Sequence, residues 1–393
     1  MGIKSIDYFG VNFFSFIGFS FFIFLPFSIN ERDGSILGLI IAVIGMFSFY
    51  IGGRTKKRFS INNVYFPRLF DFFAKIILVY YFYMTIHFFL EKIEVVSYTE
   101  SYLNVDYLAI YLKVFDVFAG FLSFYILSNY VGNNKKKFIF VAILSITVNL
   151  HSNTRLNLIL PAIFWMGYGY YFGFIKLTFL RIFSLLLLSP IVFTFLLLKR
   201  VMMGQYDSYI DQIKTIYNYL DFHTLMQNVV VSMETFRSYD IYVRIINEGF
   251  IHIESGFIRL FFMIIPRNIW TEKPESVSRI ISHNYFPEQY YGGGGTVANI
   301  FGDAYINGGV LAVIIILFFW GGISKIIYNT TIKRLYLYES DSKTRAFIIT
   351  FYLLYLMESI QYFRGFMSES FWRLLYLIAI TLILSKIFRR KNV

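Results

Sequence analysis

Cysteine is absent from this chain of 393 residues, and charged residues are scarce. Without cysteine the chain can form neither disulfides nor thiolate metal sites. Charged residues make up 15% of the sequence and hydrophobic residues 57%, whereas soluble proteins average about 25% charged and about 45 to 50% apolar residues. The composition therefore excludes an ordinary soluble protein and indicates an integral membrane protein.

The net charge of +12 does not come from a continuous basic region. The basic residues are divided into short clusters between apolar runs, which is typical of loops that face anionic lipid and the cytoplasm. This pattern excludes nucleic acid as the expected partner. The histidines His223, His252 and His283 have no metal-ligand spacing, so we expect neither a metal nor another cofactor.

Long apolar runs are abundant. A transmembrane helix needs about 20 predominantly apolar residues, and the sequence predicts ten spans, at residues 8–30, 36–53, 69–91, 107–131, 138–151, 156–174, 182–203, 309–328, 346–363 and 371–388. The run 257–270 is too short to cross, so it is either a re-entrant or interfacial helix or a buried helix of a loop. Its full insertion, or a split of the fourth span, would raise the total to about 11 or 12.

Lysine and arginine collect in alternate loops, which predicts the orientation. Their clusters lie at residues 54–68, 135–137, 176–181, 333–345 and 386–391. All these clusters fall on one side of the membrane if both termini are cytoplasmic. The outer side then receives residues 152–155, 204–308 and 364–370.

The stretch 204–308 is the only long polar interruption between the predicted spans. We expect it to be a large periplasmic loop with short or re-entrant helices that carry much of the active site, within a single polytopic domain of residues 1–393. Together with the short outer turns, it brings arginines from four regions to about the same membrane depth: Arg155, Arg237, Arg267 and Arg364. Arginine offers a planar fork of donors that suits phosphate oxygens, so this convergence favours an anionic ligand.

Each arginine also has a structural interpretation, because it could contact a lipid headgroup or a neighbouring carboxylate. Arg237 lies three residues before Asp240, and Arg364 lies near Glu358 and Glu369. A residue three positions away on a helix lies on the same face, so an ion pair is the alternative to a ligand contact.

The order of motifs along residues 150–370 resembles the O-antigen polymerase family (Wzy) of oligosaccharide repeat-unit polymerases. The motifs are NTR, RSYD, IPRNIWTEKP, GDAYINGGVLA and an outer RG. Family members often carry glutamate where Asp303 stands. The resemblance implies an all-α, GT-C-like bundle of about 10 to 12 spans with one large periplasmic loop, in the bacterial inner membrane.

The resemblance further implies a membrane glycosyltransferase that transfers a glycan from an undecaprenyl-diphosphate-linked donor to a lipid-linked acceptor. An outer active site has no nucleotide sugars, so its donor must already carry a leaving group. Membrane lipid and a polysaccharide chain-length regulator are the further partners that the family allows. The implied catalytic residues are Arg237, Arg364, Asp303 and His283. The implied substrate-binding residues are Arg155, Tyr239, Asp240, Arg244, Arg267 and Lys273.

Three other functions compete with this one. An O-antigen ligase would use the same outer arginines and differ only in its acceptor. A lipid-linked oligosaccharide flippase or another transporter would instead place charged groups near mid-membrane, in paired discontinuous helices. A scaffold without catalytic activity is the remaining alternative. The large outer loop and its charged residues at the membrane edge favour the polymerase.

Overall fold

The computed structural model describes residues 7–29, 35–59, 64, 67–90, 107–151, 155–178, 181, 234–253, 256, 258–262, 265, 269–292, 294–333, 335, 341–365 and 367–389. Within these ranges the chain is all-α, with one isolated β-bridge between Val64 and Arg389. The predicted span 182–203, the first part of the large polar loop and Arg267 lie outside the described residues.

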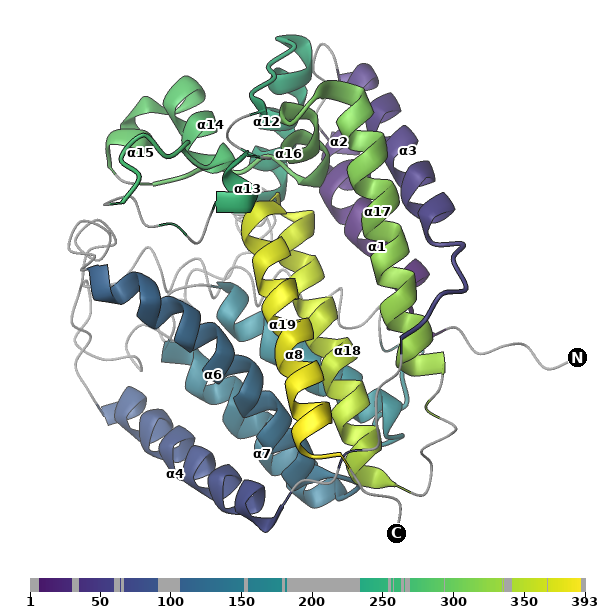
Figure 1. Cartoon of the computed structure of the whole chain (residues 1–393), viewed down its shortest axis with the longest axis vertical. Helices are drawn as coiled ribbons and strands as arrows, with labels where there is room; N and C mark the ends of the chain where they lie inside the picture. The colour runs from purple at the N-terminus through teal and green to yellow at the C-terminus, as the bar shows by residue number, and fades with distance from the viewer. Residues whose placement is uncertain are drawn as a thin grey trace, which may run out of the picture. The chain divides into compact units, whose positions relative to one another are not determined.

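Helices form at each predicted apolar span that the structure describes (Figure 1). In the first half of the chain they are α1 (Val11–Phe19), the π-helical turn η1 (Ser20–Phe24), α2 (Leu25–Ile29), α3 (Ser35–Gly52), α4 (Arg68–Leu90), α6 (Tyr107–Val131), α7 (Lys135–Thr147), the short 3₁₀ turn η2 (Val148–His151) and α8 (Arg155–Tyr171). In the second half they are α12 (Glu234–Asn247), α13 (Arg259–Phe262), α14 (Val277–Tyr285), α15 (Pro287–Tyr291), α16 (Ile300–Ile306), α17 (Gly309–Thr330), α18 (Ser342–Phe363) and α19 (Met367–Ile387).

Five of the described segments are long and apolar enough to cross a membrane: Val11–Ser28, Leu69–His87, Gly309–Thr330, Ser342–Phe363 and Met367–Ile387. A shorter apolar helix covers Ile36–Gly52. The protein is therefore an all-α membrane protein, as its composition predicts. The total of ten spans stays a prediction.

Contacts divide the chain into two compact units. The first contains Met1–Ile61, Glu234–Arg334 and Glu358–Ala379. The second contains Asn62–Met233, Leu335–Met357 and Ile380–Val393. The division passes through α18 and α19, so each of these helices contributes residues to both units.

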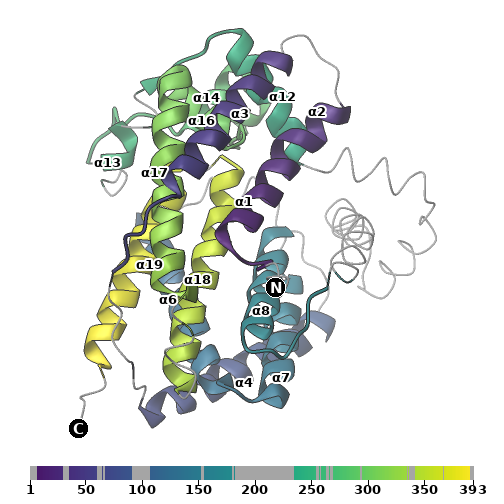
Figure 2. The same cartoon turned by 90° about the vertical axis from the view of Figure 1, so that its right-hand side faces the viewer.

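In the first unit, α3 and α17 pack with their backbones in close approach, and Figures 1 and 2 show them side by side. A Cβ added at Gly52 would collide with the Phe318 carbonyl, and one at Gly321 would collide with the Phe49 carbonyl. Small residues permit this approach, and membrane helices use it because van der Waals contact, rather than exclusion of water, drives their association. The two glycines therefore explain why these helices pair.

Helices α12 to α16 of the first unit fold the described part of the predicted outer loop around a small apolar core. This core contains Ile241, Ile245, Val277, Ile281, Ala298 and Ile306. A glycine pair then separates α16 from α17: Gly308 has φ 149° and Gly309 has φ 66°. These backbone angles disfavour other residues, which explains the glycines of the GDAYINGGVLA motif.

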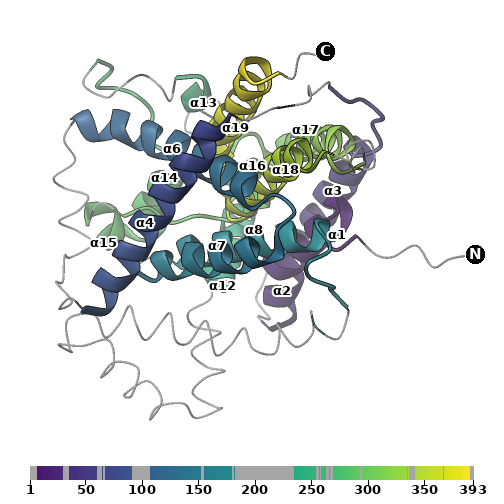
Figure 3. The same cartoon turned by 90° about the horizontal axis from the view of Figure 1, so that it is seen from below.

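The second unit is built on α4, α6, α7 and α8, and Figure 3 shows α7 and α8 side by side. Aromatic side chains fill the contact between these two helices, where Phe138, Trp165 and Tyr168 pack together. The Tyr168 hydroxyl lies 3.0 Å from the carbonyl oxygens of both Ser128 and Gly132. These two contacts fix α8 to the end of α6. They also give the hydroxyl of this buried tyrosine hydrogen-bond partners in an otherwise apolar environment.

The apolar run 257–270 contains only the four-residue helix α13 among its described residues. Phe261 is 70% exposed and Ile269 is 72% exposed. These exposures favour the interfacial alternative over a buried helix of the loop, and both stay predictions. A surface segment at the membrane interface is the interpretation that these exposures support.

Candidate functional site

Helix α12 presents two of the predicted arginines on one exposed face. Its apolar side chains Tyr239, Tyr242 and Ile245 are buried, whereas Arg237 and Arg244 are exposed and seven residues apart. Seven residues make about two helical turns, so both arginines lie on the same side of the helix. The Tyr242 hydroxyl donates to the Gly38 carbonyl at 2.6 Å, which anchors α12 to α3.

Arg237 is held by a partner that the sequence did not predict. Its Nη2 donates to Gln289 Oε1 at 2.8 Å, and its guanidinium lies 4.3 Å from the centre of the Phe286 ring. Gln289 Oε1 also accepts the Thr296 hydroxyl at 2.6 Å. A flat cation stacked on a ring and bonded at one edge keeps a defined orientation. Asp240, the expected partner, lies half-buried on the same helix.

Asp303 is buried in α16 and holds the turn that carries Arg364. Its Oδ2 accepts the backbone N–H of Met367 at 2.9 Å, and its side chain is 2% exposed. Its other oxygen, Oδ1, has no hydrogen-bond partner within the described residues. Burial raises the pKa of Asp303 to about 7; the Met367 amide acts to lower this pKa and the charge of Glu369 to raise it. A carboxyl group with such a pKa can exchange a proton near neutral pH.

The Arg364 turn is also fixed by its glycine. Gly365 has φ 100°, and a Cβ there would collide with the Ala298 carbonyl. Arg364 is half-buried and donates to Gln361 Oε1 at 3.2 Å. The glycine of the outer RG motif is therefore required by packing, and it presses the arginine turn against the segment that precedes α16.

A buried ion pair that the sequence analysis missed lies next to this turn. Glu358 is 1% exposed, and its carboxylate oxygens lie 2.7 Å from Arg373 Nε and 2.9 Å from Arg373 Nη2. From the sequence, Glu358 was instead a possible partner of Arg364. A charge inside the last predicted span needs a partner, so the position of Arg373 within 371–388 was a signal for this pair.

Residues 296–299 connect the two arginine positions. Thr296 shares Gln289 with Arg237, and Ala298 contacts Gly365 beside Arg364. Asn299 caps α16 by accepting the backbone N–H groups of Phe301 and Gly302, each at 3.1 Å. Thus one short segment of the first unit supports both Arg237 and Arg364.

The remaining predicted site residues are placed differently. Lys273 is buried and donates to the Ile265 carbonyl at 2.7 Å, so it fixes the backbone of the loop. Tyr239 is buried, its hydroxyl has no partner within the described ranges, and burial raises its pKa to about 12. Arg155 begins α8 in the second unit, and its side chain is outside the description.

His283 is exposed on α14 within an aromatic and charged cluster. Its ring centre lies 4.8 Å from that of Tyr290. The Arg279 guanidinium lies 4.3 Å from the same tyrosine ring and 3.5 Å from Glu275, and the Tyr290 hydroxyl donates to Glu275 at 3.1 Å. Exposed aromatic rings beside charged groups can stack on a sugar and bind its hydroxyls.

Among the described residues, no group of three or more histidine, aspartate or glutamate side chains is placed to hold a metal ion. Comparison with known proteins found no match to this chain among protein-family models, curated proteins or solved structures.

Proposed function

We propose that this protein is a membrane glycosyltransferase that polymerises oligosaccharide repeat units carried on undecaprenyl diphosphate. The observation that carries the proposal is the shared support of Arg237 and Arg364 by residues 296–299. This one segment thereby contacts Gln289, which holds Arg237, and Gly365, which follows Arg364. An anionic group with several oxygens, such as a diphosphate, is the ligand chemistry that matches them.

In the proposed reaction, the bond between the anomeric carbon of the donor glycan and its diphosphate breaks. The diphosphate leaves with the electron pair, and a hydroxyl of the acceptor repeat unit forms the new glycosidic bond. Arg237 and Arg364 stabilise the charge that develops on the departing diphosphate. The proton of the attacking hydroxyl passes to Asp303, whose pKa of about 7 suits a general base. His283 is the alternative acceptor.

The proposal places the protein in the bacterial inner membrane, with 10 to 12 spans and with the helices α12 to α16 on the periplasmic side. The alternating distribution of lysine and arginine supports this orientation. The exposed apolar side chains of Phe261 and Ile269 support a position of this region at the membrane interface. A lipid-linked donor presents its diphosphate at that depth.

The test is the lipopolysaccharide of a strain that lacks this gene. A polymerase joins repeat units but does not attach the first unit to its acceptor, so we expect lipopolysaccharide with at most one repeat unit. Complementation with the full chain should restore the ladder. An unchanged ladder in the mutant would contradict the proposal. Loss of the single-repeat band as well would identify a ligase or a flippase instead.

A further inference from the structure

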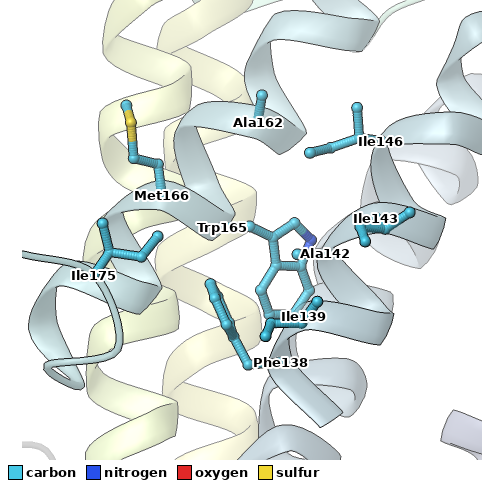
Figure 4. Close-up of a pocket in the computed structure, with 9 residues that line it drawn as sticks. All are labelled: Phe138, Ile139, Ala142, Ile143, Ile146, Ala162, Trp165, Met166 and Ile175. Atoms are coloured by element: carbon cyan, nitrogen blue, oxygen red, sulfur yellow. The ribbon is translucent and has the colours of Figure 1, made fainter. Parts of the chain in front are cut away.

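Helices α7 and α8 of the second unit, with Ile175 beyond α8, line an open apolar cavity of about 290 Å³. Figure 4 shows its lining, which consists of Phe138, Ile139, Ala142, Ile143, Ile146, Ala162, Trp165, Met166 and Ile175. Ile139 is 47% exposed and Ile143 is 58% exposed, so the α7 side of the cavity reaches the protein surface. In a membrane protein such a surface meets hydrocarbon, and an apolar groove there accepts an acyl chain.

Three lysines lie directly before this cavity. Lys135, Lys136 and Lys137 form the first turn of α7, and Phe138 is the first lining residue. Lys135 and Lys136 are exposed, whereas Lys137 donates to the Tyr130 carbonyl at 3.3 Å. The helix dipole adds positive potential at this end. The mouth of the cavity therefore attracts an anion.

The cavity also contains a polar donor without a partner. Trp165 is 1% exposed, and its Nε1 has no hydrogen-bond partner in the part of the chain that the structure describes. Figure 4 shows this nitrogen on the side of the indole that faces Ile143. The Phe138 and Trp165 ring centres are 6.2 Å apart, so the indole packs against the lining residue that directly follows the lysines.

We propose that this cavity binds one anionic phospholipid. Its phosphate lies at Lys135 and Lys136, one acyl chain lies between α7 and α8, and an ester carbonyl accepts the Trp165 N–H. The groove thus offers cations for an anionic headgroup, a donor for an ester carbonyl and an apolar lining for hydrocarbon. A buried water would need two to four polar partners, and the lining supplies only the indole. All residues that line the cavity belong to the second unit, whereas Arg237, Asp303 and Arg364 belong to the first.

Native mass spectrometry of the purified, delipidated full chain tests this site with added phosphatidylglycerol or phosphatidylcholine. We expect tighter binding of phosphatidylglycerol. The double variant Lys135→Gln/Lys136→Gln should weaken it roughly thirtyfold, since each basic residue contributes on the order of 1 kcal/mol to anionic-lipid binding. The variant Lys56→Gln/Lys57→Gln removes the same charge from exposed lysines elsewhere and should bind normally.

Two further variants test the proposed positions of the lipid's acyl chain and of its ester carbonyl. Ala162→Phe fills the cavity and should remove the bound lipid, whereas Ile163→Phe, at a neighbouring position that does not line the cavity, should keep it. Trp165→Phe retains a ring but removes the N–H, so we expect about two- to tenfold weaker binding. Equal weakening by both lysine pairs, equal affinity for both phospholipids, or preferential binding of an isoprenyl diphosphate would each overturn the proposal.

Discussion

Arg237 and Arg364 are held differently, and their substitutions therefore separate charge from geometry. Arg237 is exposed, stacked on Phe286 and bonded to Gln289, whereas Arg364 is half-buried on a turn that Asp303 anchors. A residue that contacts only lipid headgroups needs a positive charge. A residue that grips a diphosphate also needs the planar fork.

Replacing Arg237 or Arg364 by alanine should remove about 2 to 4 kcal/mol of transition-state stabilisation, which corresponds to a roughly hundredfold or greater loss of rate. Lysine should restore only part of the activity, because it lacks the paired donors. The measurement is polymerised chain per amount of membrane-inserted protein, with Lys333→Ala, an exposed position outside the site, as the control. Near-normal ladders from both alanine variants would contradict the proposal that these arginines bind the departing diphosphate.

Asp303 makes stability depend on pH in a direction that follows from its burial. Its pKa rises from 3.8 in the unfolded reference to about 7 in the folded protein. Between these values the folded state holds a proton that the unfolded state has lost, so stability falls as pH rises from about 4 to 7. We expect the difference in unfolding temperature between Asp303→Asn and the wild type to change in favour of the variant as pH rises through this window. Above the window the difference should stay constant. A difference that is constant through the window itself would contradict the raised pKa.

The same variant tests the role of Asp303 in the reaction. Asparagine still offers an oxygen to the Met367 N–H but cannot accept a proton. Loss of polymerisation with unimpaired stability would identify Asp303 as the base, and full activity would transfer that role to His283. His283→Gln is the matched comparison, because this side chain is exposed and its replacement should leave the unfolding temperature unchanged.

At the residue scale, the sequence predicted which side chains could bind an anion but not what holds them. Arg237 and Arg364 were recognised because they fall in outer segments between apolar runs. Arg373 was missed although its charge inside a predicted span was a signal. Gln289 and Thr296 were not recognised, because the contact between Gln289 and Arg237 joins residues that are 52 positions apart. Such pairings depend on the fold of the loop, and no local pattern indicates them.

At the scale of helices, apolar length was a sufficient signal. The bounds of the described helices at the apolar runs were predicted to within a few residues, because about 20 apolar residues have no other stable arrangement in a bilayer than a helix. Short helices were expected in the polar loop, but the positions of α12, α14 and α16 within it were not predicted. Their apolar faces, such as Ile241 and Ile245 on α12, are short and separated by polar residues.

The contact between α3 and α17 yields a test with neighbouring glycines. Gly321→Ala should destabilise the protein, because its Cβ would collide with the Phe49 carbonyl. At Gly322 a Cβ would lie 3.7 Å from the Gly52 carbonyl oxygen, an ordinary contact. Gly322→Ala should therefore be neutral or stabilising by up to about 1 kcal/mol, the helix-propensity gain. Thermal unfolding in detergent compares the two, and equal midpoints would contradict the close packing.

The ion pair between Glu358 and Arg373 predicts that loss of the arginine alone is more destabilising than loss of both charges. Arg373→Ala leaves the Glu358 carboxylate buried without its cation, and such a loss typically costs about 3 to 5 kcal/mol. Adding Glu358→Gln should recover part of the stability, because the buried charge is then removed. Unfolding midpoints of the single and double variants measure this coupling. A double variant less stable than Arg373→Ala would show that the carboxylate has another partner.

At the scale of the whole chain, the topology is the prediction with the widest consequences. The lysine and arginine clusters place both termini in the cytoplasm and residues 204–308 outside. Reporter domains fused after Tyr290 and after Asn329 should therefore give signals from opposite sides of the membrane, since α17 lies between these points. Matching signals would contradict this orientation and would also remove the periplasmic location from the proposed function.

The π-helical turn η1, near the start of the chain, contacts a residue that is synthesised much later. Asn299 Nδ2 donates to the Phe22 carbonyl of this turn at 3.5 Å, across a separation of 277 residues. Ribosomes add about 5 to 20 residues per second, so the carbonyl waits on the order of ten seconds or longer for its partner. The first helix can thus enter the bilayer early, but its native packing is completed only after the loop has been translated.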